Sequence, residues 1–491
     1  MLLNLVVFIT GAVVMVVELT GSRIIAPYAG TSLTIWTNLI GILLGCLSLG
    51  YFFGGKLADS HPTKNRLGTL LLIASFFLSF IPLLNKFFLP LLFKSFLDYR
   101  FLAGVSTFLL FGVPSILLGM VSPYVLKLSL TSTTRSGTTA GTLYALATVG
   151  SIVGTFLAGY VLIAWIGSDL IFFLLAVCML LLSLCLLARR RIVVLSCAIF
   201  LGSMIGIIYS TPFLPFIQQP ILSEDTPYSH VIIDITNDWI TGKPVRELKL
   251  NDVHDSAIFL NGKDLVYPYT KYYRLADNFV PNIQRALMIG GGGYTYPEEF
   301  IHTHPSAKMD IVEIDPELTE LAEQYFGFRP TPNTTIYNED GRTFLNREPY
   351  QYDAIFLDAF AGYTTPFQLT TKEALIHLSD MLSLNGVIIS NTVSPILGSG
   401  GKLFQSEYAT YKAVFPFVAV FPVTYPDDGY ALQNVMIVAS KNTLPLTTAN
   451  TKYQSYLQTR WQKNIPSDVP LLTDDYAPVE YYTVSMLDQS R

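Results

Sequence analysis

Charge is distributed unevenly along this chain, and that asymmetry limits what the chain can fold into. Lys, Arg, Asp and Glu are scarce before about Thr211 and common after it, while 51% of all residues are hydrophobic and only 14% are charged. A helix needs about 20 mainly apolar residues to cross roughly 30 Å of hydrocarbon. The sequence therefore predicts a transmembrane helical domain over residues 1–211 and a water-facing part after it.

Seven apolar stretches are long enough to be membrane-spanning helices. A further segment, residues 87–96, holds Pro90 and Lys94 among bulky apolar side chains, which is typical of a helix lying at the membrane surface. The predicted spans cover approximately residues 2–21, 33–55, 67–85, 101–121, 138–165, 169–188 and 192–211.

Charge and residue spacing make two kinds of partner, nucleic acid and metal ions, unexpected. The formal net charge is −5, and the later part of the chain has no Lys-rich run with interleaved aromatic residues, so we expect no nucleic-acid partner. His254, His302, His304 and His377 show no metal-ligand spacing, and all four cysteines lie in apolar segments. We therefore expect no metal site.

The water-facing part begins with short strands. Runs typical of strands cover residues 229–235, 247–250 and 257–260, and Asn261-Gly262 is a turn signal. This pattern predicts a small antiparallel β-unit, and residues 212–281 are assigned to a linker and that unit.

Strands and helices then alternate, which predicts a doubly wound, Rossmann-like domain over residues 282–491, of the type found in class I methyltransferases. Helices are expected from about Tyr296 and over residues 316–325, and a β-pair closes the sheet at 419–423 and 435–439. The other predicted strands cover residues 285–289, 309–313, 335–337, 354–357 and 386–390.

Glycines and acidic residues follow the first two of these strands. Gly290, Gly291 and Gly292 come directly after a buried strand, where glycine allows a sharp turn and a close approach of the backbone to a ligand. Glu313 follows the next strand, about twenty residues on, at the spacing where an acid meets ribose hydroxyls. The pair indicates a nucleoside site.

Two more acidic positions follow the third and fourth strands, Asp340-Gly341 and Asp358. Each one alone is compatible with a helix cap or a turn, because Asp is favoured at both. All of them in order, at the carboxyl ends of successive strands, favour a nucleoside pocket over a set of coincidental caps.

The ordered motifs resemble the spermidine synthases, and specifically their membrane-fused relatives, over nearly the whole chain. The resemblance covers about residues 224–482, and it extends to residues 18–27 (ELTGSRIIAP), 358–360, 365–370 and 472–480 (LTDDYAPVE). It implies that Gly290, Gly291 and Gly292 hold the methionine-derived arm of the cofactor, Glu313 the ribose, and Asp340 with Gly341 the adenine. It also implies that Asp358 is the acid that helps to deprotonate the attacking amine.

The sequence departs from that family where the amine should bind. Gly293 stands where soluble spermidine synthases carry an acid, Tyr228-Ser229 replaces a Tyr-Gln pair, and Tyr272-Tyr273-Arg274 replaces a segment ending in Glu. Tyr228, Asp255, Tyr272 and Arg274 are the candidate substrate-binding residues, with Asp252 and Asp255 as possible replacements for the missing acids. Because Arg274 would repel a diamine and pair with a carboxylate, we expect weak spermidine synthesis from putrescine and binding of S-adenosylmethionine at least as tight as that of its decarboxylated form.

The leading function is therefore transfer of a group from an S-adenosylmethionine-type sulfonium, aminopropyl by family, to an amine or amino-acid-like acceptor. One alternative is an S-adenosylmethionine-dependent methyltransferase or other adenosyl-sulfonium enzyme. Another is a transporter-like or sensor protein whose soluble domain only binds a nucleoside. The lipid bilayer is the second expected partner, and a homo-oligomer is left open.

Membrane topology is the least consistent part of the prediction. Basic residues cluster in the second, fourth and sixth loops, which places those loops in the cytoplasm, and residues 55–59 resemble a cytoplasmic loop of major-facilitator transporters. A seventh crossing after Arg191 would then put the soluble domain outside, where adenosyl-sulfonium cofactors are not expected. Either residues 192–210 are re-entrant, another helix is miscounted, or the domain faces outward; the pocket residues favour the cytoplasm.

Overall fold

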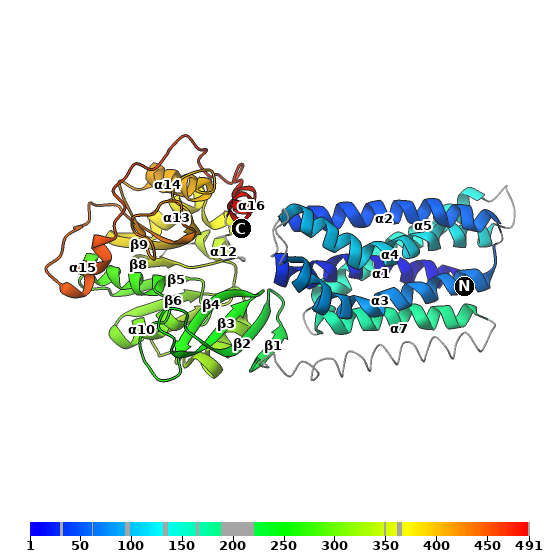
Figure 1. The fold of residues 1–491 in the computed structure, drawn as a ribbon, viewed down its shortest axis with the longest axis horizontal. Coiled ribbons are helices and arrows are strands. Elements are labelled where there is room, and N and C mark those ends of the chain that lie inside the picture. Colours follow the sequence, from blue (N-terminus) through cyan, green and yellow to red (C-terminus); the bar gives the residue numbers. More distant parts are fainter. Residues whose placement is uncertain are drawn as a thin grey trace. The chain divides into compact units, whose positions relative to one another are not determined.

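The computed structural model describes residues 1–29, 33–60, 62–93, 99–130, 136–163, 166–187, 220–347, 350–360 and 366–489 (Figure 1). The chain divides into two compact units. One comprises Met1–Gln219 with Glu224–His230, and the other comprises Pro220–Ser223 with Val231–Arg491. The first unit is helical, and the second contains most of the β-structure.

The first unit is a bundle of long apolar helices. Among the described residues, six helices are long and apolar enough to cross a membrane. The seventh predicted span, residues 192–211, lies outside the described residues. The helices are α1 (Leu2–Ala29), α2 (Leu33–Ser60), α3 (Lys64–Phe93), α4 (Tyr99–Ser129), α5 (Ser136–Leu157, continued by the π-helical turn η2, Ala158–Leu162) and α7 (Ser168–Leu186).

Two segments of the bundle differ from the prediction. Helix α3 is continuous to Phe93, so residues 87–93 extend a spanning helix instead of forming a separate surface helix. Proline is compatible with such a helix because neighbouring helices and local backbone adjustments satisfy the freed backbone groups. Residues 55–59, predicted as a loop, form the last turns of α2, where Asp59 pairs with Lys127 of α4 at 2.8 Å.

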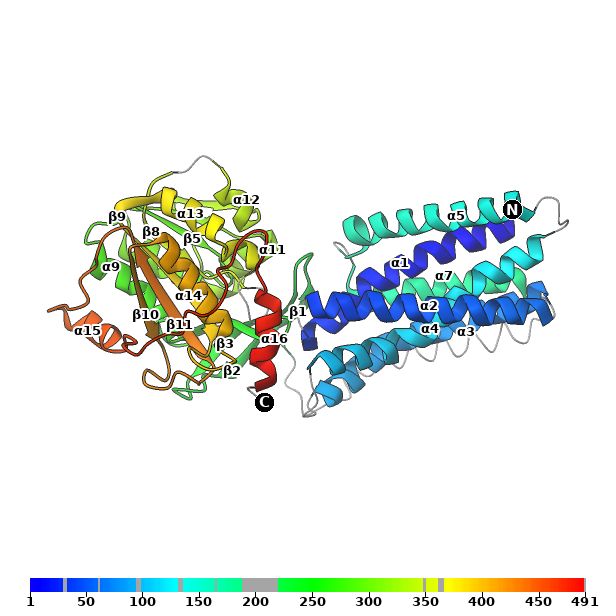
Figure 2. The same ribbon diagram turned by 90° about the horizontal axis from the view of Figure 1, so that it is seen from above.

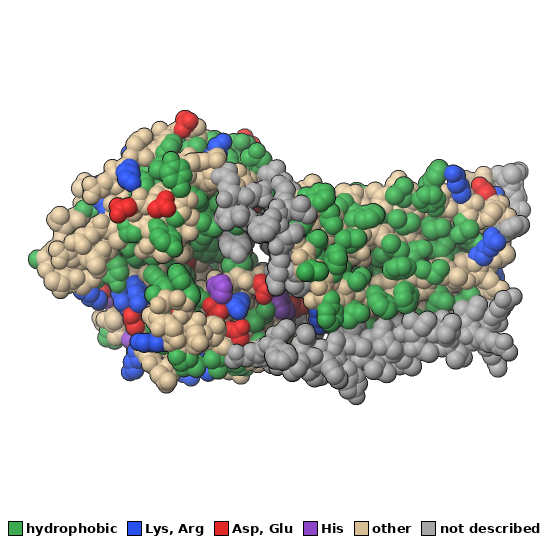
Figure 3. All heavy atoms as spheres, in the orientation of Figure 1, with side chains coloured by type: hydrophobic (Ala, Val, Ile, Leu, Met, Phe, Trp, Pro, Cys, Tyr) green, Lys and Arg blue, Asp and Glu red, His purple; other side chains and the backbone are tan. Residues whose placement is uncertain are grey.

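Glycine allows pairs of bundle helices to pack closely. Helix α2 packs on α4, and α5 packs on α1 (Figure 2). A Cβ atom on Gly119 would lie 2.7 Å from the carbonyl oxygen of Leu47, and one on Gly150 would collide with the carbonyl oxygen of Phe8. Close backbone approach of this kind replaces the hydrophobic drive that lipid does not provide. Hydrophobic side chains cover the face of these helices seen in Figure 3, as a lipid-exposed surface requires.

The small β-unit is a four-stranded sheet in the order β1-β2-β3-β4, as predicted in kind. Its strands are β1 (Leu222–Asp225), β2 (His230–Asn237), β3 (Pro244–Leu250) and β4 (Val253–Phe259). Strands β3 and β4 are antiparallel and are joined by Asn251 and Asp252, with φ of 51° and 61°. Positive φ at both positions is the conformation of a two-residue hairpin turn, which Asn and Asp tolerate.

The main sheet has seven strands in the order β10-β11-β9-β8-β5-β6-β7. Neighbouring strands from β9 to β7 are parallel. Strands β10 and β11 form the closing pair that the sequence predicts, and the structure shows this pair to be antiparallel. The strands are β5 (Arg285–Ile289), β6 (Lys308–Val312), β7 (Thr334–Tyr337), β8 (Tyr352–Leu357), β9 (Leu382–Ser394), β10 (Phe417–Pro422) and β11 (Gln433–Ser440). The fold is thus the Rossmann-like one expected.

Helices cover both faces of this sheet (Figure 1). Because successive side chains of a strand point to opposite faces, Met288 and Phe356 enter one apolar core, and Leu287 and Ile355 the other. The helices and helical turns of this unit are η3 (Tyr269–Arg274), α9 (Leu275–Phe279), α10 (Thr295–Thr303), α11 (Pro316–Leu321), η4 (Ala322–Phe326), α12 (Gly341–Leu345), η5 (Phe367–Leu369), α13 (Lys372–Met381), α14 (Lys402–Val414), α15 (Thr451–Gln458) and α16 (Val479–Gln489).

Candidate active site

The glycine loop after β5 lies against the end of β8. Gly290 has φ of +93°, and a Cβ atom there would collide with the carbonyl oxygen of Asp358. The amide of Gly290 donates a hydrogen bond to the carbonyl oxygen of Val312 at 2.9 Å. The amide of Asp358 donates one to the carbonyl oxygen of Ile289 at 2.9 Å. Only glycine combines this conformation with so close a contact. The carboxyl ends of β5, β6 and β8 therefore meet at one point.

Glu313, directly after β6, holds this loop with its carboxylate. Its Oε2 atom accepts hydrogen bonds from the amides of Gly291 at 2.8 Å and Gly292 at 3.1 Å, and its Oε1 atom accepts one from the amide of Asp315 at 3.0 Å. Burial raises the pKa of Glu313, which these hydrogen bonds partly oppose. A carboxylate offers about four acceptor sites, so about one stays open, and the ribose-binding role of Glu313 stays a prediction.

Asp340 and Gly341 begin helix α12 at the end of β7. The Oδ1 atom of Asp340 accepts a hydrogen bond from the amide of Thr343 at 2.9 Å, which makes this residue the N-cap of the helix. A Cβ atom on Gly341 would lie 2.9 Å from the side chain of Ile289, at the end of β5. Asp340 thus serves as a helix cap, and its adenine-binding role stays a prediction.

Asp358 stands at the end of β8 with polar side chains around it. Its Oδ1 atom accepts a hydrogen bond of 3.0 Å from Nδ2 of Asn391 on β9. Burial raises the pKa of Asp358 to about 7, and the negative charge of Asp255 adds to this effect. The neighbouring hydroxyl groups of Tyr269 and Tyr273 act in the opposite direction, as does Asn391. The arrangement produces a carboxyl group that exchanges a proton near neutral pH.

Strand β4 brings Asp255 and Ser256 to the other side of the glycine loop. The hydroxyl of Ser256 donates to Oδ1 of Asp255 at 2.8 Å and accepts from the amide of Gly293 at 3.0 Å. Burial raises the pKa of Asp255. Asp255 therefore lies with Asp358 and Glu313 around the glycines, and its substrate-binding role stays a prediction.

The side chain of Arg274 is paired with two carboxylates. Its Nε and Nη2 atoms each lie 2.6 Å from one carboxylate oxygen of Glu299 on α10, and Nη2 also lies 2.7 Å from Oδ1 of Asp264. These carboxylates raise the pKa of the guanidinium, Glu299 most strongly. The two carboxylates offset the positive charge of the guanidinium, so it attracts a substrate carboxylate only weakly. The predicted pairing of Arg274 with a cofactor carboxylate therefore has no support in the structure.

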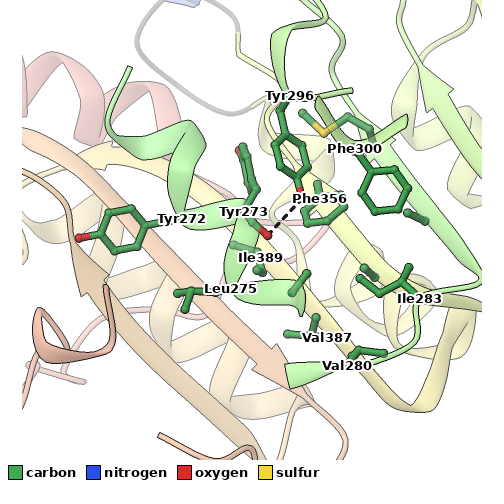
Figure 4. Packing of buried hydrophobic residues seen from close by; sticks show 14 of the residues in the cluster. Tyr272, Tyr273, Leu275, Val280, Ile283, Tyr296, Phe300, Phe356, Val387 and Ile389 are labelled. Atoms are coloured by element: carbon green, nitrogen blue, oxygen red, sulfur yellow. Dashed lines mark hydrogen bonds between the residues drawn. The ribbon is translucent and has the colours of Figure 1, made fainter. Parts of the chain in front are cut away.

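Two other predicted substrate-binding residues are Tyr272 and Tyr228. The ring of Tyr272 packs on Tyr456, with centroids 4.9 Å apart, and its hydroxyl lies 3.0 Å from that of Thr459. Figure 4 shows it directed away from the group formed by Tyr273, Tyr296 and Phe356. Tyr228 is 45% exposed and belongs to the other compact unit. Its predicted role stays a prediction.

Four further residues contribute to the site that the sequence alone did not single out: Tyr269, Tyr273, Asn391 and Ser256. Two signals were available. Residues 267–273 contain four tyrosines, and Asn391 is an amide in the buried part of β9, soon after the apolar residues 387–389. A polar side chain in a buried strand requires a hydrogen-bond partner, which here is Asp358.

Part of the second unit is similar to known proteins. Residues 273–450 match the family model "Spermine/spermidine synthase domain". A polyamine aminopropyltransferase of Vibrio vulnificus is 36% identical over 177 residues, 35% of this chain and 55% of that protein. A probable polyamine aminopropyl transferase of Bifidobacterium longum is 29% identical over 254 residues, 48% of this chain and 56% of that protein.

The chain thus spans about half the length of these two curated relatives. Among solved structures, a probable spermidine synthase from Corynebacterium glutamicum is 24% identical and has a TM-score of 0.41, covering 50% of this chain and 86% of that one.

Proposed function

We propose, from the premise that this chain carries a spermine/spermidine synthase domain at residues 273–450, that it transfers an aminopropyl group from an adenosyl sulfonium to an amine. The two aminopropyltransferases named above support this choice of group. The observation that carries the proposal is the position of Asp358, which lies beside the glycine loop with its pKa raised to about 7.

The reaction is an in-line displacement. The amine nitrogen attacks the carbon attached to the sulfonium, the new C–N bond forms, the C–S bond breaks, and the thioether leaves with the electron pair. The amine loses a proton, and Asp358 is the group that accepts it. A general base works best when its pKa lies near the operating pH, so a carboxyl group near 7 suits this task far better than one near 4.

The remaining residues position the donor. Glu313 and Asp340 follow β6 and β7, and we assign them the ribose and the adenine. Glu313 already fixes the glycine loop through two amides, so its geometry is set before any ligand binds. Positioning accounts for much of the rate of such a displacement. The preference for intact S-adenosylmethionine predicted from Arg274 loses its basis, because Glu299 and Asp264 engage that side chain.

The helical unit supplies the second part of the proposal. The six described helices of spanning length anchor the enzyme in a membrane. The second unit then lies on the cytoplasmic side, where adenosyl cofactors are available.

Substitution of the base separates this function from mere nucleoside binding. In the purified full-length protein, Asp358→Asn preserves the shape of the side chain and the possibility of a hydrogen bond to Asn391, so donor affinity by calorimetry should change by less than about threefold. Turnover should fall by about a hundredfold or more. Loss of donor binding without a separate effect on rate would make Asp358 a structural residue and would overturn its assignment as the base.

A further inference from the structure

We infer that Asp255 recognises the primary ammonium group on the transferred chain and thereby selects the decarboxylated donor over S-adenosylmethionine. The inference deepens the proposed function and rests on it. It concerns a carboxylate that comes from the small β-sheet, outside the strand ends where the other acidic residues of the site lie.

A β-bulge directs Asp255 into the site. In the pairing of β3 with β4, Leu248 lies opposite Ser256 and Lys249 lies opposite His254, so Asp255 is an extra residue without a partner in β3. An inserted residue of this kind bends the strand and changes the direction of a side chain, and such bulges are frequent next to active sites. Without the bulge, strict alternation would leave residue 255 on a different face of the sheet.

The glycine loop leaves room for this carboxylate. Gly292 has φ of +50°, and a Cβ atom there would collide with Oδ1 of Asp255. A Cβ atom on Gly293 would lie 2.6 Å from Cβ of Ser256. Neither position accommodates a side chain of its own. The negative charge at this point of the loop therefore comes from strand β4, at the place where Gly293 lacks an acid.

The charges around the glycine loop indicate which ligand group belongs there. Asp255 raises the pKa values of both Asp358 and Glu313, so three carboxyl groups share one poorly hydrated space. The basic side chains nearest along the chain are engaged with other carboxylates: Lys249 with Asp234 and Glu247, Lys271 with Asp264, and Arg274 with Glu299 and Asp264. A ligand cation offsets the carboxylates, because buried like charges require a counter-charge.

The two donors differ in the one group that matters here. The decarboxylated donor carries an ammonium group at the end of its chain and no carboxylate. Intact S-adenosylmethionine brings a carboxylate next to the same ammonium, and this adds a negative charge near three carboxyl groups. The opposing charge argument from Arg274 does not apply, since Glu299 and Asp264 pair with that guanidinium. Asp255 thus favours the chain without a carboxylate.

Calorimetry with three ligands tests this role: the decarboxylated donor, S-adenosylmethionine and 5′-methylthioadenosine, which has the nucleoside and sulfur but no ammonium group. Asp255→Asn should weaken binding of the decarboxylated donor by roughly ten- to a hundredfold, the effect of losing a charge-assisted hydrogen bond. Methylthioadenosine affinity should stay within about twofold, and Asp255→Glu should recover part of the loss. Asp252→Asn, in the exposed hairpin turn, is the matched control and should leave all three affinities unchanged.

Other outcomes identify what has failed. An equal loss for all three ligands, or no loss for any, would overturn the role of Asp255, as would tighter binding of S-adenosylmethionine than of the decarboxylated donor by the unmodified protein. Unmodified protein that binds none of the three would contradict the proposed function instead. Binding of the decarboxylated donor through Asp255 without transfer to any amine would leave the inference intact and refute the transferase activity.

Discussion

Nδ2 of Asn391 donates a hydrogen bond of 3.0 Å to Oδ1 of Asp358, and Oδ1 of Asn391 in turn accepts one of 3.0 Å from Nδ2 of Asn434. The carboxylate at the end of β8 is thus held by an amide on β9, which is itself held by an amide on β11. A donor in this position favours the ionised form of Asp358, whereas burial and the charge of Asp255 favour the protonated form.

The first prediction concerns pH. Because the pKa of Asp358 is raised to about 7, the base is mostly protonated at pH 6 and mostly ionised at pH 8, and kcat/KM should rise across that interval. Asn391→Ala removes the hydrogen bond to the ionised form, so the rise should move to higher pH while donor affinity changes little. A rate profile that is flat between pH 6 and 8 would contradict the assignment of Asp358 as the base.

The second prediction concerns stability. Glu407 on α14 is buried, accepts a hydrogen bond from the hydroxyl of Thr392 at 2.7 Å, and has no partner for Oε1 within the described residues. Burial raises its pKa to about 7. Since the folded state binds this proton more tightly than the unfolded state, the stabilising effect is full below about pH 4.5 and is lost as pH rises through about 7.

Replacement of Glu407 by Gln removes the buried charge at nearly constant volume. At pH 8 the thermal midpoint of the detergent-solubilised protein should rise by about 2–4 °C, which corresponds to about 1 kcal/mol for a domain of this size. The gain should disappear at pH 5, where Glu407 is already protonated. A lower midpoint for Glu407→Gln at pH 8 would show that the ionised carboxylate has a favourable role.

The third prediction separates Arg274 from the cofactor. Its bidentate pairing with Glu299 is mostly shielded, with side-chain exposures of 18% and 19%. Arg274→Met strands Glu299, so we expect a loss of about 1–3 kcal/mol in the free energy of unfolding and an unchanged preference between the two donors. Lys271 forms a more exposed pair with Asp264, which also contacts Arg274. Lys271→Met should therefore lower the free energy of unfolding by less than about 1 kcal/mol. A reversal of donor preference in Arg274→Met would restore the original prediction.

These residues show where sequence reasoning reaches its limit. Strand order in a doubly wound sheet brings residues after successive strands together, so Gly290, Glu313 and Asp358 were predictable from position alone. The partner of Arg274 was not, because Glu299 lies on a separate helix and only the packing of η3 against α10 brings it opposite.

Local geometry hid two further features. Which of the neighbours Tyr272 and Tyr273 faces Asp358 depends on the orientation of a single short 3₁₀ turn, and sequence spacing fixes such an orientation poorly. The direction of Asp255 depends on one inserted residue in β4, and a bulge has no signature in the alternation of apolar and polar side chains. Both orientations become evident only in the three-dimensional structure.

The fourth prediction concerns the side of the membrane. Lys243 is exposed in the hairpin between β2 and β3. A cysteine introduced there should resist an impermeant thiol reagent in intact cells and react after lysis, because adenosyl donors are cytoplasmic. The parent chain, whose four cysteines all lie in the apolar part, is the labelling control. Labelling before lysis would place the soluble unit outside and would contradict a function that uses an adenosyl donor.

Identification of the thioether product tests the transfer reaction most directly. The purified full-length protein is incubated with the decarboxylated donor or with S-adenosylmethionine and a set of primary amines, including putrescine, and the nucleoside products are separated by mass spectrometry. Aminopropyl transfer releases 5′-methylthioadenosine, whereas methyl transfer from S-adenosylmethionine releases S-adenosylhomocysteine. The account predicts 5′-methylthioadenosine, formed from the decarboxylated donor only when an amine is present and reduced by about a hundredfold or more in Asp358→Asn. Formation of S-adenosylhomocysteine alone, or of neither thioether with any amine, would contradict it.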